Sequence, residues 1–236
     1  MERLKRSVFI ALALFGFVGI SCEVIDVQEI PLSEIKHVLT KQDEKQALNS
    51  QVEIVNQNKP KFSSEELSIA KGNWQIFSDL DSLNRVSEAK AMLHKNRMPT
   101  EERERLYIKP TGWKQKKMKN GDYLYNRCHL IGYQLTGENN NPRNLMTGTR
   151  SFNTPGMVEY ENKVADYLRK TGNHFLYRVT PDFRGNELVA RGVRIEAQSI
   201  EDSQLSVHVY VHNVQEGYTI NYLTGESSVN KKSQSL

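Results

Sequence analysis

The sequence of 236 residues predicts an α+β protein with an antiparallel sheet at its core. Two observations predict this class. Apolar residues alternate with polar ones in "HFLYRVT", "ELVARGVRIEAQSI" and "LSVHVYVHN", which indicates strands separated by short turns. One strong helical pattern, "MVEYENKVADYLRKTGN", lies ahead of these strands, and a further strand pattern precedes the helix.

The chain begins with the pattern of a secretory signal. Arg3, Lys5 and Arg6 precede the apolar run "VFIALALFGFVGI", which is shorter than the ~20 residues that a membrane span needs. We expect residues 1–21 to be a signal peptide and the protein to be secreted; an uncleaved membrane anchor is the alternative. Removing these residues takes away three basic groups and Glu2, so the net charge falls from +4 to about +2. So small a charge does not by itself predict a polyanionic partner.

Composition predicts how the rest of the chain is organised. Residues 22–71 are polar and poor in aromatic residues, and we expect an extension that is partly disordered. We expect the folded domain to span residues 72–225 and residues 226–236 to form a flexible tail. The two cysteines, Cys22 and Cys128, exclude a disulfide framework because Cys22 stands at the signal boundary.

The first half of the folded domain predicts its elements less clearly. Residues 86–93, "VSEAKAML", suit a strand or a helix, and Pro99 with the acidic residues after it suggests the start of a short helix. The segment 103–119 is basic, which suits either a solvated surface or an approach path for phosphates. Its basic residues are Arg103, Arg105, Lys109, Lys114, Lys116, Lys117 and Lys119.

The stretch "YLYNRCHLIG" predicts a strand that carries chemical groups on one face. Alternation places Arg127 and His129 on the same side, with Cys128 on the other. A guanidinium beside a neutral imidazole lowers the imidazole pKa, so we expect Arg127 to keep His129 available as a base. A histidine that only packs is the alternative interpretation.

Two more residues stand out around the helix. Glu161 lies on the apolar stripe of the helix, where an ionised carboxylate needs a partner, a hydrogen bond or a metal. Asn153 stands ahead of the helix as either a cap or an oxygen ligand for Mg²⁺. His208 and His212 are ~13 Å apart on a strand, so we expect surface residues and no shared metal.

At "NRCHLIGYQLTGENNNPRNLMTGTRSFN" the chain resembles the DNA/RNA non-specific endonucleases with a ββα-metal, or His-Me, finger. It is most similar to secreted streptococcal DNases of the streptodornase type and to the DNA-entry nuclease of related bacteria. The resemblance runs from about Trp74 to Gly225. The family motif Asp-Arg-Gly-His stands here as Asn126-Arg127-Cys128-His129, which leaves the role of a carboxylate at position 126 open.

The resemblance implies roles for individual residues. His129 is the general base, Arg127 contacts the substrate, Asn153 binds a single Mg²⁺ and Glu161 holds metal-bound water. Asn144 and Asn126 support the site. Apart from the resemblance, Arg85, Lys109, Arg150 and Arg191 are candidates for further phosphate contacts, with ordinary surface charge as the alternative.

The resemblance implies hydrolysis of phosphodiester bonds in DNA to give 5′-phosphate ends, with RNA as a second substrate left open. The cofactor expected is Mg²⁺, with Mn²⁺ as a substitute, and we expect a monomer. Two other functions remain open at this point. One is a degenerate nuclease fold that binds nucleic acid or a host molecule, and the other is a membrane-anchored nuclease that acts in DNA uptake.

Overall fold

The structure is a computed structural model that describes residues 51–230. These residues belong to one unit, which spans Thr40–Leu236. The expected signal peptide, residues 22–50 of the expected extension and residues 231–236 of the expected tail lie outside the described residues. Within residues 51–230, no helix is long and apolar enough to cross a membrane.

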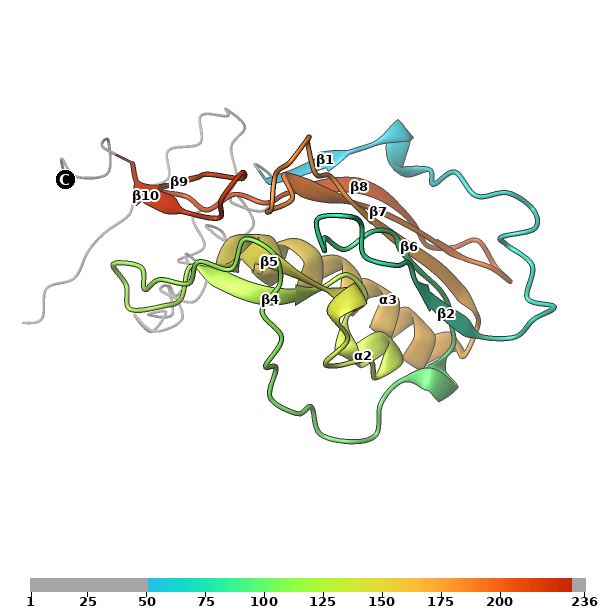
Figure 1. Cartoon of the computed structure of the whole chain (residues 1–236). Helices are drawn as coiled ribbons and strands as arrows, with labels where there is room; N and C mark the ends of the chain where they lie inside the picture. Colours follow the sequence, from blue (N-terminus) through green and yellow to red (C-terminus); the bar gives the residue numbers. More distant parts are fainter. Residues whose placement is uncertain (1–50, 231–236) are drawn as a thin grey trace, which may run out of the picture. The chain divides into compact units, whose positions relative to one another are not determined.

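A six-stranded antiparallel sheet forms the centre of this unit, as the alternating segments predict (Figure 1). The strands follow the order β1-β8-β7-β6-β3-β2 across the sheet. Strands β6, β7 and β8 are consecutive in sequence and lie side by side, joined by the loops 182–191 and 200–205. The bounds are β1 Val52–Ile54, β2 Trp74–Phe77, β3 Ala89–Leu93, β6 Phe175–Pro181, β7 Gly192–Ser199 and β8 Ser206–His212.

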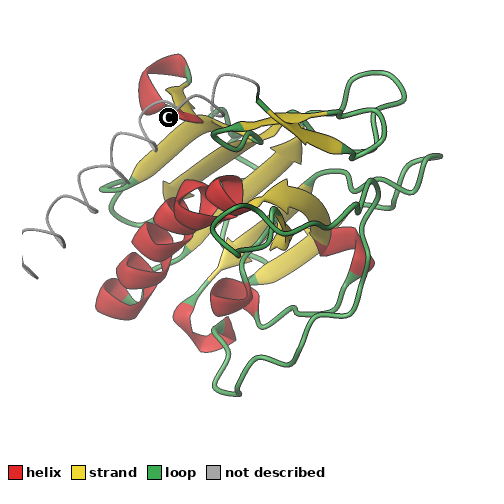
Figure 2. Ribbon diagram, turned by 90° about the vertical axis from the view of Figure 1, so that its left-hand side faces the viewer, coloured by secondary structure: helices red, strands yellow, loops and turns green. Residues whose placement is uncertain are grey.

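A separate strand pair and one long helix make a ββα unit. Strand β4 (Tyr125–His129) pairs with β5 (Leu145–Thr149). A π-helical turn, η4 (Phe152–Met157), then leads into α3 (Val158–Thr171), which packs across one face of the sheet (Figure 2). The loop between β4 and β5 contains the short helix α2 (Tyr133–Thr136) and η3 (Pro142–Asn144).

The hydrophobic core lies between α3 and the sheet. Val164, Ala165 and Leu168 of α3 are buried in one cluster with the inward residues of the strands, among them Ile195 and Val209. This is the apolar stripe that the helical pattern predicts. A second, smaller cluster joins β4 to the β9–β10 pair through Leu124, Tyr125 and Ile220. The bounds of that pair are β9 Tyr218–Ile220 and β10 Ser227–Val229.

The folded unit is longer at both ends than the sequence predicts. Strand β1 and the 3₁₀ turn η1 (Asn56–Asn58) fall within the expected extension, yet β1 pairs with β8 as part of the sheet. Strand β10 lies within the expected tail and pairs with β9. The predicted boundaries fail because both segments are polar in composition and gain their order from main-chain pairing, which composition does not reveal.

Two ambiguous segments in the first half are also decided. Of residues 86–93, the part that forms regular structure is strand β3, whose inward residues Ala89 and Ala91 are buried. The segment after Pro99 is an extended loop, not the expected short helix. This loop carries Arg103 toward the ββα unit, where its side chain joins the pocket described below.

Candidate active site

A pocket of about 260 Å³ opens where β4, α2, η4 and α3 meet. Its walls combine residues from β4 and from α3. The fold thus brings Arg127 of β4 and Glu161 of α3, which are 34 positions apart in the sequence, into one pocket. The predicted residues Arg127, His129, Asn153 and Glu161 all line it. The other lining residues are Arg103, Gly132, Tyr133, Gln134 and Val158.

His129 is buried at the end of β4, with 7% of its surface exposed. Its Nε2 lies 2.8 Å from the main-chain carbonyl oxygen of Asn139. A carbonyl only accepts hydrogen bonds, so Nε2 must carry the proton and the lone pair of the neutral ring is on Nδ1. Burial lowers the pKa of His129 to about 4, against the hydrogen bond to Asn139, which raises it. The imidazole is therefore neutral at physiological pH and has a free base at Nδ1.

The positive charge that acts on His129 comes from Arg103, and the expectation that Arg127 lowers its pKa is wrong. The Arg127 guanidinium stacks 4.6 Å from the ring centre of Trp113, and its Nε donates to the main-chain carbonyl of Ile108. Arg127 still lines the pocket, and within residues 51–230 its terminal nitrogens have no hydrogen-bond partner. It is thus held as a cation beside His129, available to a phosphate.

The loop that contains Asn139, Asn140 and Asn141 positions both His129 and Arg103. The main-chain carbonyl of Asn139 holds His129, and its side chain accepts from Arg103 Nε at 3.3 Å and donates to the carbonyl of Glu104 at 3.0 Å. Asn140 in turn binds the main chain of Arg105 at 3.1 Å. No sequence pattern predicts a role for these residues, and the run of three consecutive asparagines is the signal that points to them.

Glu161 is buried on α3, as its place on the apolar stripe predicts, with 7% of its surface exposed. Burial raises the pKa of its carboxyl to about 7, and the charge of Arg103 opposes that rise. Within residues 51–230 no hydrogen bond reaches this carboxylate. Gly132 forms the wall against it: a Cβ at that position would lie 2.8 Å from Oε1 and 2.5 Å from Cδ. Only glycine leaves space for the carboxyl in its present place.

The residues present fit a single hard cation. Glu161 supplies a buried carboxylate that lacks a hydrogen-bond partner in the described chain, and Asn153 supplies an amide on the same pocket wall. Mg²⁺ prefers oxygen ligands, keeps several waters and needs few groups from the protein. A transition-metal site would need more ligands of other kinds, and within residues 51–230 no three His, Cys, Asp or Glu side chains are grouped to hold a metal.

A profile of the DNA/RNA non-specific endonucleases matches residues 67–201, more than half of the chain. The chain belongs to this family. The match covers the whole ββα unit, and its α+β fold agrees with that of solved relatives. The NucA nuclease from Streptococcus agalactiae is 27% identical, with a TM-score of 0.67 over 80% of this chain and 96% of that one. A second structure of NucA contains a magnesium ion.

Two further relatives are more distant or shorter in overlap. The Sda1 nuclease with a bound zinc ion is 26% identical, with a TM-score of 0.58 over 67% of this chain and 80% of that one. A deoxyribonuclease from Streptococcus dysgalactiae subsp. equisimilis is 32% identical over 112 residues, 45% of this chain. The chain spans about a third of the length of that relative, 34%.

Asn126 and Cys128 of the motif, and Asn144 after it, do not line the pocket. The Asn144 side chain is fully buried and bridges the main chain of Ile131, accepting from its N–H at 2.9 Å and donating to its carbonyl at 3.0 Å. Cys128 is fully buried, as expected of a packing residue, and burial raises the pKa of its thiol. Asn126 offers its carbonyl to Cys128 Sγ at 3.6 Å. His129 is therefore held by Asn139 and not by residue 126.

Three of the arginines and lysines expected to contact phosphates are instead bound to the protein. Arg85 pairs with Asp81 at 2.7 Å and donates to the carbonyls of Gly185 and Glu187, so these groups occupy its guanidinium in the structure. Arg191 pairs with Glu187 and stacks on Tyr222. Arg150 pairs with Asp122 at 3.2 Å and Lys109 is exposed, and neither lines the pocket.

Proposed function

We propose that this endonuclease-family protein is a secreted, Mg²⁺-dependent DNase that hydrolyses phosphodiester bonds without sequence preference and leaves 5′-phosphate ends. One observation carries the proposal. A neutral His129 with its lone pair on Nδ1 faces the same pocket as two arginines, an amide and a buried carboxylate. Such a set of a base, cations and hard oxygen ligands suits phosphate chemistry.

In the proposed reaction His129 takes a proton from water at Nδ1 while the oxygen attacks phosphorus. The main-chain carbonyl of Asn139 stabilises the imidazolium that forms, since it accepts from the Nε2–H in both states. Arg127 and Arg103 bring positive charge to the non-bridging oxygens of the phosphate. Phosphate contacts carry no base information, so this set predicts no sequence preference.

Asn153 would hold Mg²⁺ directly and Glu161 would hold it through water. Bound there, the ion would supply positive charge to the oxyanion that develops on the departing 3′ oxygen. Glu161 must be ionised to hold the cation's water. Burial raises the pKa of this carboxyl and so opposes its ionisation, whereas the charge of Arg103 favours the ionised form.

Cleavage of supercoiled plasmid by purified protein tests the proposal. We expect nicking and then fragmentation with Mg²⁺, none in EDTA, and product ends that a ligase accepts without kinase treatment. Nicking that persists in EDTA would exclude the metal-dependent mechanism. Stable plasmid binding without cleavage in Mg²⁺ or Mn²⁺ would favour a degenerate nucleic-acid-binding protein. The N-terminal sequence of the protein recovered from culture medium tests secretion and distinguishes it from membrane anchoring.

A further inference from the structure

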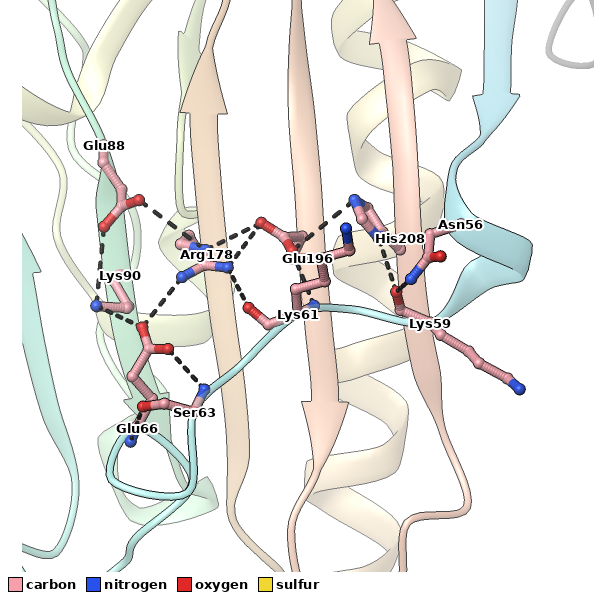
Figure 3. Close-up of polar contacts among 10 residues, drawn as sticks. All are labelled: Asn56, Lys59, Lys61, Ser63, Glu66, Glu88, Lys90, Arg178, Glu196 and His208. Carbon is pink, nitrogen blue, oxygen red and sulfur yellow. Dashed lines mark hydrogen bonds and ion pairs between the residues drawn. The ribbon is translucent and has the colours of Figure 1, made fainter.

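The sheet face opposite α3 carries a row of charged side chains. Lys90, Arg178, Glu196 and His208 stand side by side on β3, β6, β7 and β8, each in register with the next. Their neighbours along the strands point into the core under α3, so these four point the other way. Residues 56–66, here called the strap, cross over this row (Figure 3).

Other residues of the protein neutralise Glu196 of the row and Glu66 of the strap. Arg178 donates to Glu196 Oε2 from Nε at 3.0 Å and from a terminal nitrogen at 2.8 Å, and it also pairs with Glu66 at 3.0 Å. Lys90 pairs with Glu66 at 2.9 Å. The strap supplies the Lys61 main-chain N–H to Glu196 Oε1 at 3.0 Å. Neither carboxylate is left as an uncompensated negative charge.

His208 is the unusual member of the row. The expectation of a surface residue is wrong, since 3% of it is exposed beneath the strap. Its Nδ1 lies 2.7 Å from the main-chain carbonyl of Lys59 and must donate to it. Its Nε2 is buried and has no hydrogen-bond partner within residues 51–230; Glu196 Oε1 is 3.8 Å away. A buried ring nitrogen left unpaired costs stability unless a ligand completes it.

His208 also lines a cavity of about 370 Å³ that has several basic residues in its wall. Lys61 and Arg194 line the cavity, and within residues 51–230 neither side chain has an ion pair. The Lys61 side chain turns back over the sheet toward Glu196 and His208 (Figure 3). Among the lining residues, the basic Lys61, Arg178 and Arg194 stand against the acidic Glu196. The difference, three minus one, leaves two positive charges.

We infer that this cavity is a second phosphate-binding site, which takes a phosphate group of nucleic acid away from the catalytic pocket. The inference rests on the proposed function for the identity of the polyanion. A phosphate would accept from Lys61 Nζ and from Arg194 and would lie beside the His208 ring. A metal cation is disfavoured, because Lys61 and Arg178 would repel it. The cavity lies on the sheet face opposite α3, so it holds a different segment from the one being cut.

Binding is tested in EDTA, where no cleavage interferes. Inorganic phosphate is titrated into the full chain while the ¹⁵N resonances of the His208 ring are followed. We expect a saturable shift at Nε2, and at least a tenfold weaker apparent affinity in the double variant Lys61→Ala/Arg194→Ala. That variant keeps the strap, since Lys61 binds Glu196 and Arg178 through its main chain only. Lys95→Ala/Lys170→Ala removes two exposed charges elsewhere and should bind like wild type.

Binding of DNA distinguishes phosphates within the chain from phosphates at its 5′ end as the group that enters the cavity. If chain phosphates enter the cavity, the double variant binds long duplex with a salt slope smaller by about two than that of wild type. If only terminal phosphates enter, it loses its preference for a 5′-phosphorylated over a 5′-hydroxyl oligonucleotide and keeps the slope. A His208 ring unaffected by phosphate, or equal affinities in both double variants, overturns the inference. A saturable shift in a protein that never cuts plasmid retains this site and overturns the proposed function instead.

Discussion

Replacing Gly132 by alanine would place a methyl group against the carboxyl of Glu161. The new Cβ would lie 2.8 Å from Oε1 and 2.5 Å from Cδ, where ordinary contacts start near 3.4 Å. The carboxyl must therefore withdraw by about 1 Å, and a misplacement of that size costs about 100-fold in rate. The backbone at Gly132, with φ −58° and ψ 144°, is open to alanine. We expect the melting temperature to stay within a few degrees of wild type. The poorer packing against Glu161 destabilises the folded state, but alanine also lowers the conformational entropy of the unfolded chain, which offsets that loss.

Initial rates of plasmid nicking in Mg²⁺ provide the assay, read as a double-mutant cycle with Glu161→Ala. If Gly132 acts only by positioning Glu161, each single variant is slow and the double variant is no slower than Glu161→Ala alone. A near-wild-type rate for Gly132→Ala would refute the reasoning. So would additive losses in the cycle, because they would mean that Gly132 acts on something other than this carboxyl.

Three further outcomes follow from the same geometry. The pKa of the Glu161 carboxyl rises from 4.5 to about 7 on folding, so its ionisation destabilises the fold increasingly as the pH rises from 4.5 to 7, and fully above that. In EDTA, Glu161→Gln should therefore raise the free energy of unfolding by about 3 kcal/mol at pH 8 and by about 1 kcal/mol at pH 5. Denaturant titration at the two pH values checks this difference. Asn144→Ala should lose about 3 kcal/mol, because it leaves the buried N–H and carbonyl of Ile131 unpaired. Arg85→Ala should lower the melting temperature by several degrees with unchanged KM for DNA; a raised KM at unchanged stability would restore Arg85 as a substrate contact.

The parts of the site that local periodicity encodes could be predicted from the sequence. Strand alternation places Arg127 and His129 on one face, and helical spacing places Glu161 on the buried side of α3. Both statements depend only on residues within one element. The same periodicity predicts that, along the chain, strands come first, then the central helix, then further strands, since each strong pattern lies inside a single strand or helix.

Interactions between distant segments could not be predicted in this way. Arg103 reaches the pocket from an extended loop, and no periodicity governs where a loop side chain points. His208 alternates as an outward residue, yet a strap about 150 positions earlier in the chain covers it. Strand alternation favours Arg127 as the cation that lowers the pKa of His129, because the two residues share a face. The cation that does so is Arg103, which comes from a distant loop.

The proposed mechanism depends on neutral His129 as the base of a nuclease. Its most direct test is plasmid cleavage by His129→Ala in Mg²⁺, with and without added imidazole. The variant should lose at least 100-fold in rate, and imidazole should restore part of it by entering the space that the side chain leaves. Wild type and the exposed-site variant Lys170→Ala should not respond to imidazole. Cleavage by His129→Ala at an undiminished rate would contradict the account.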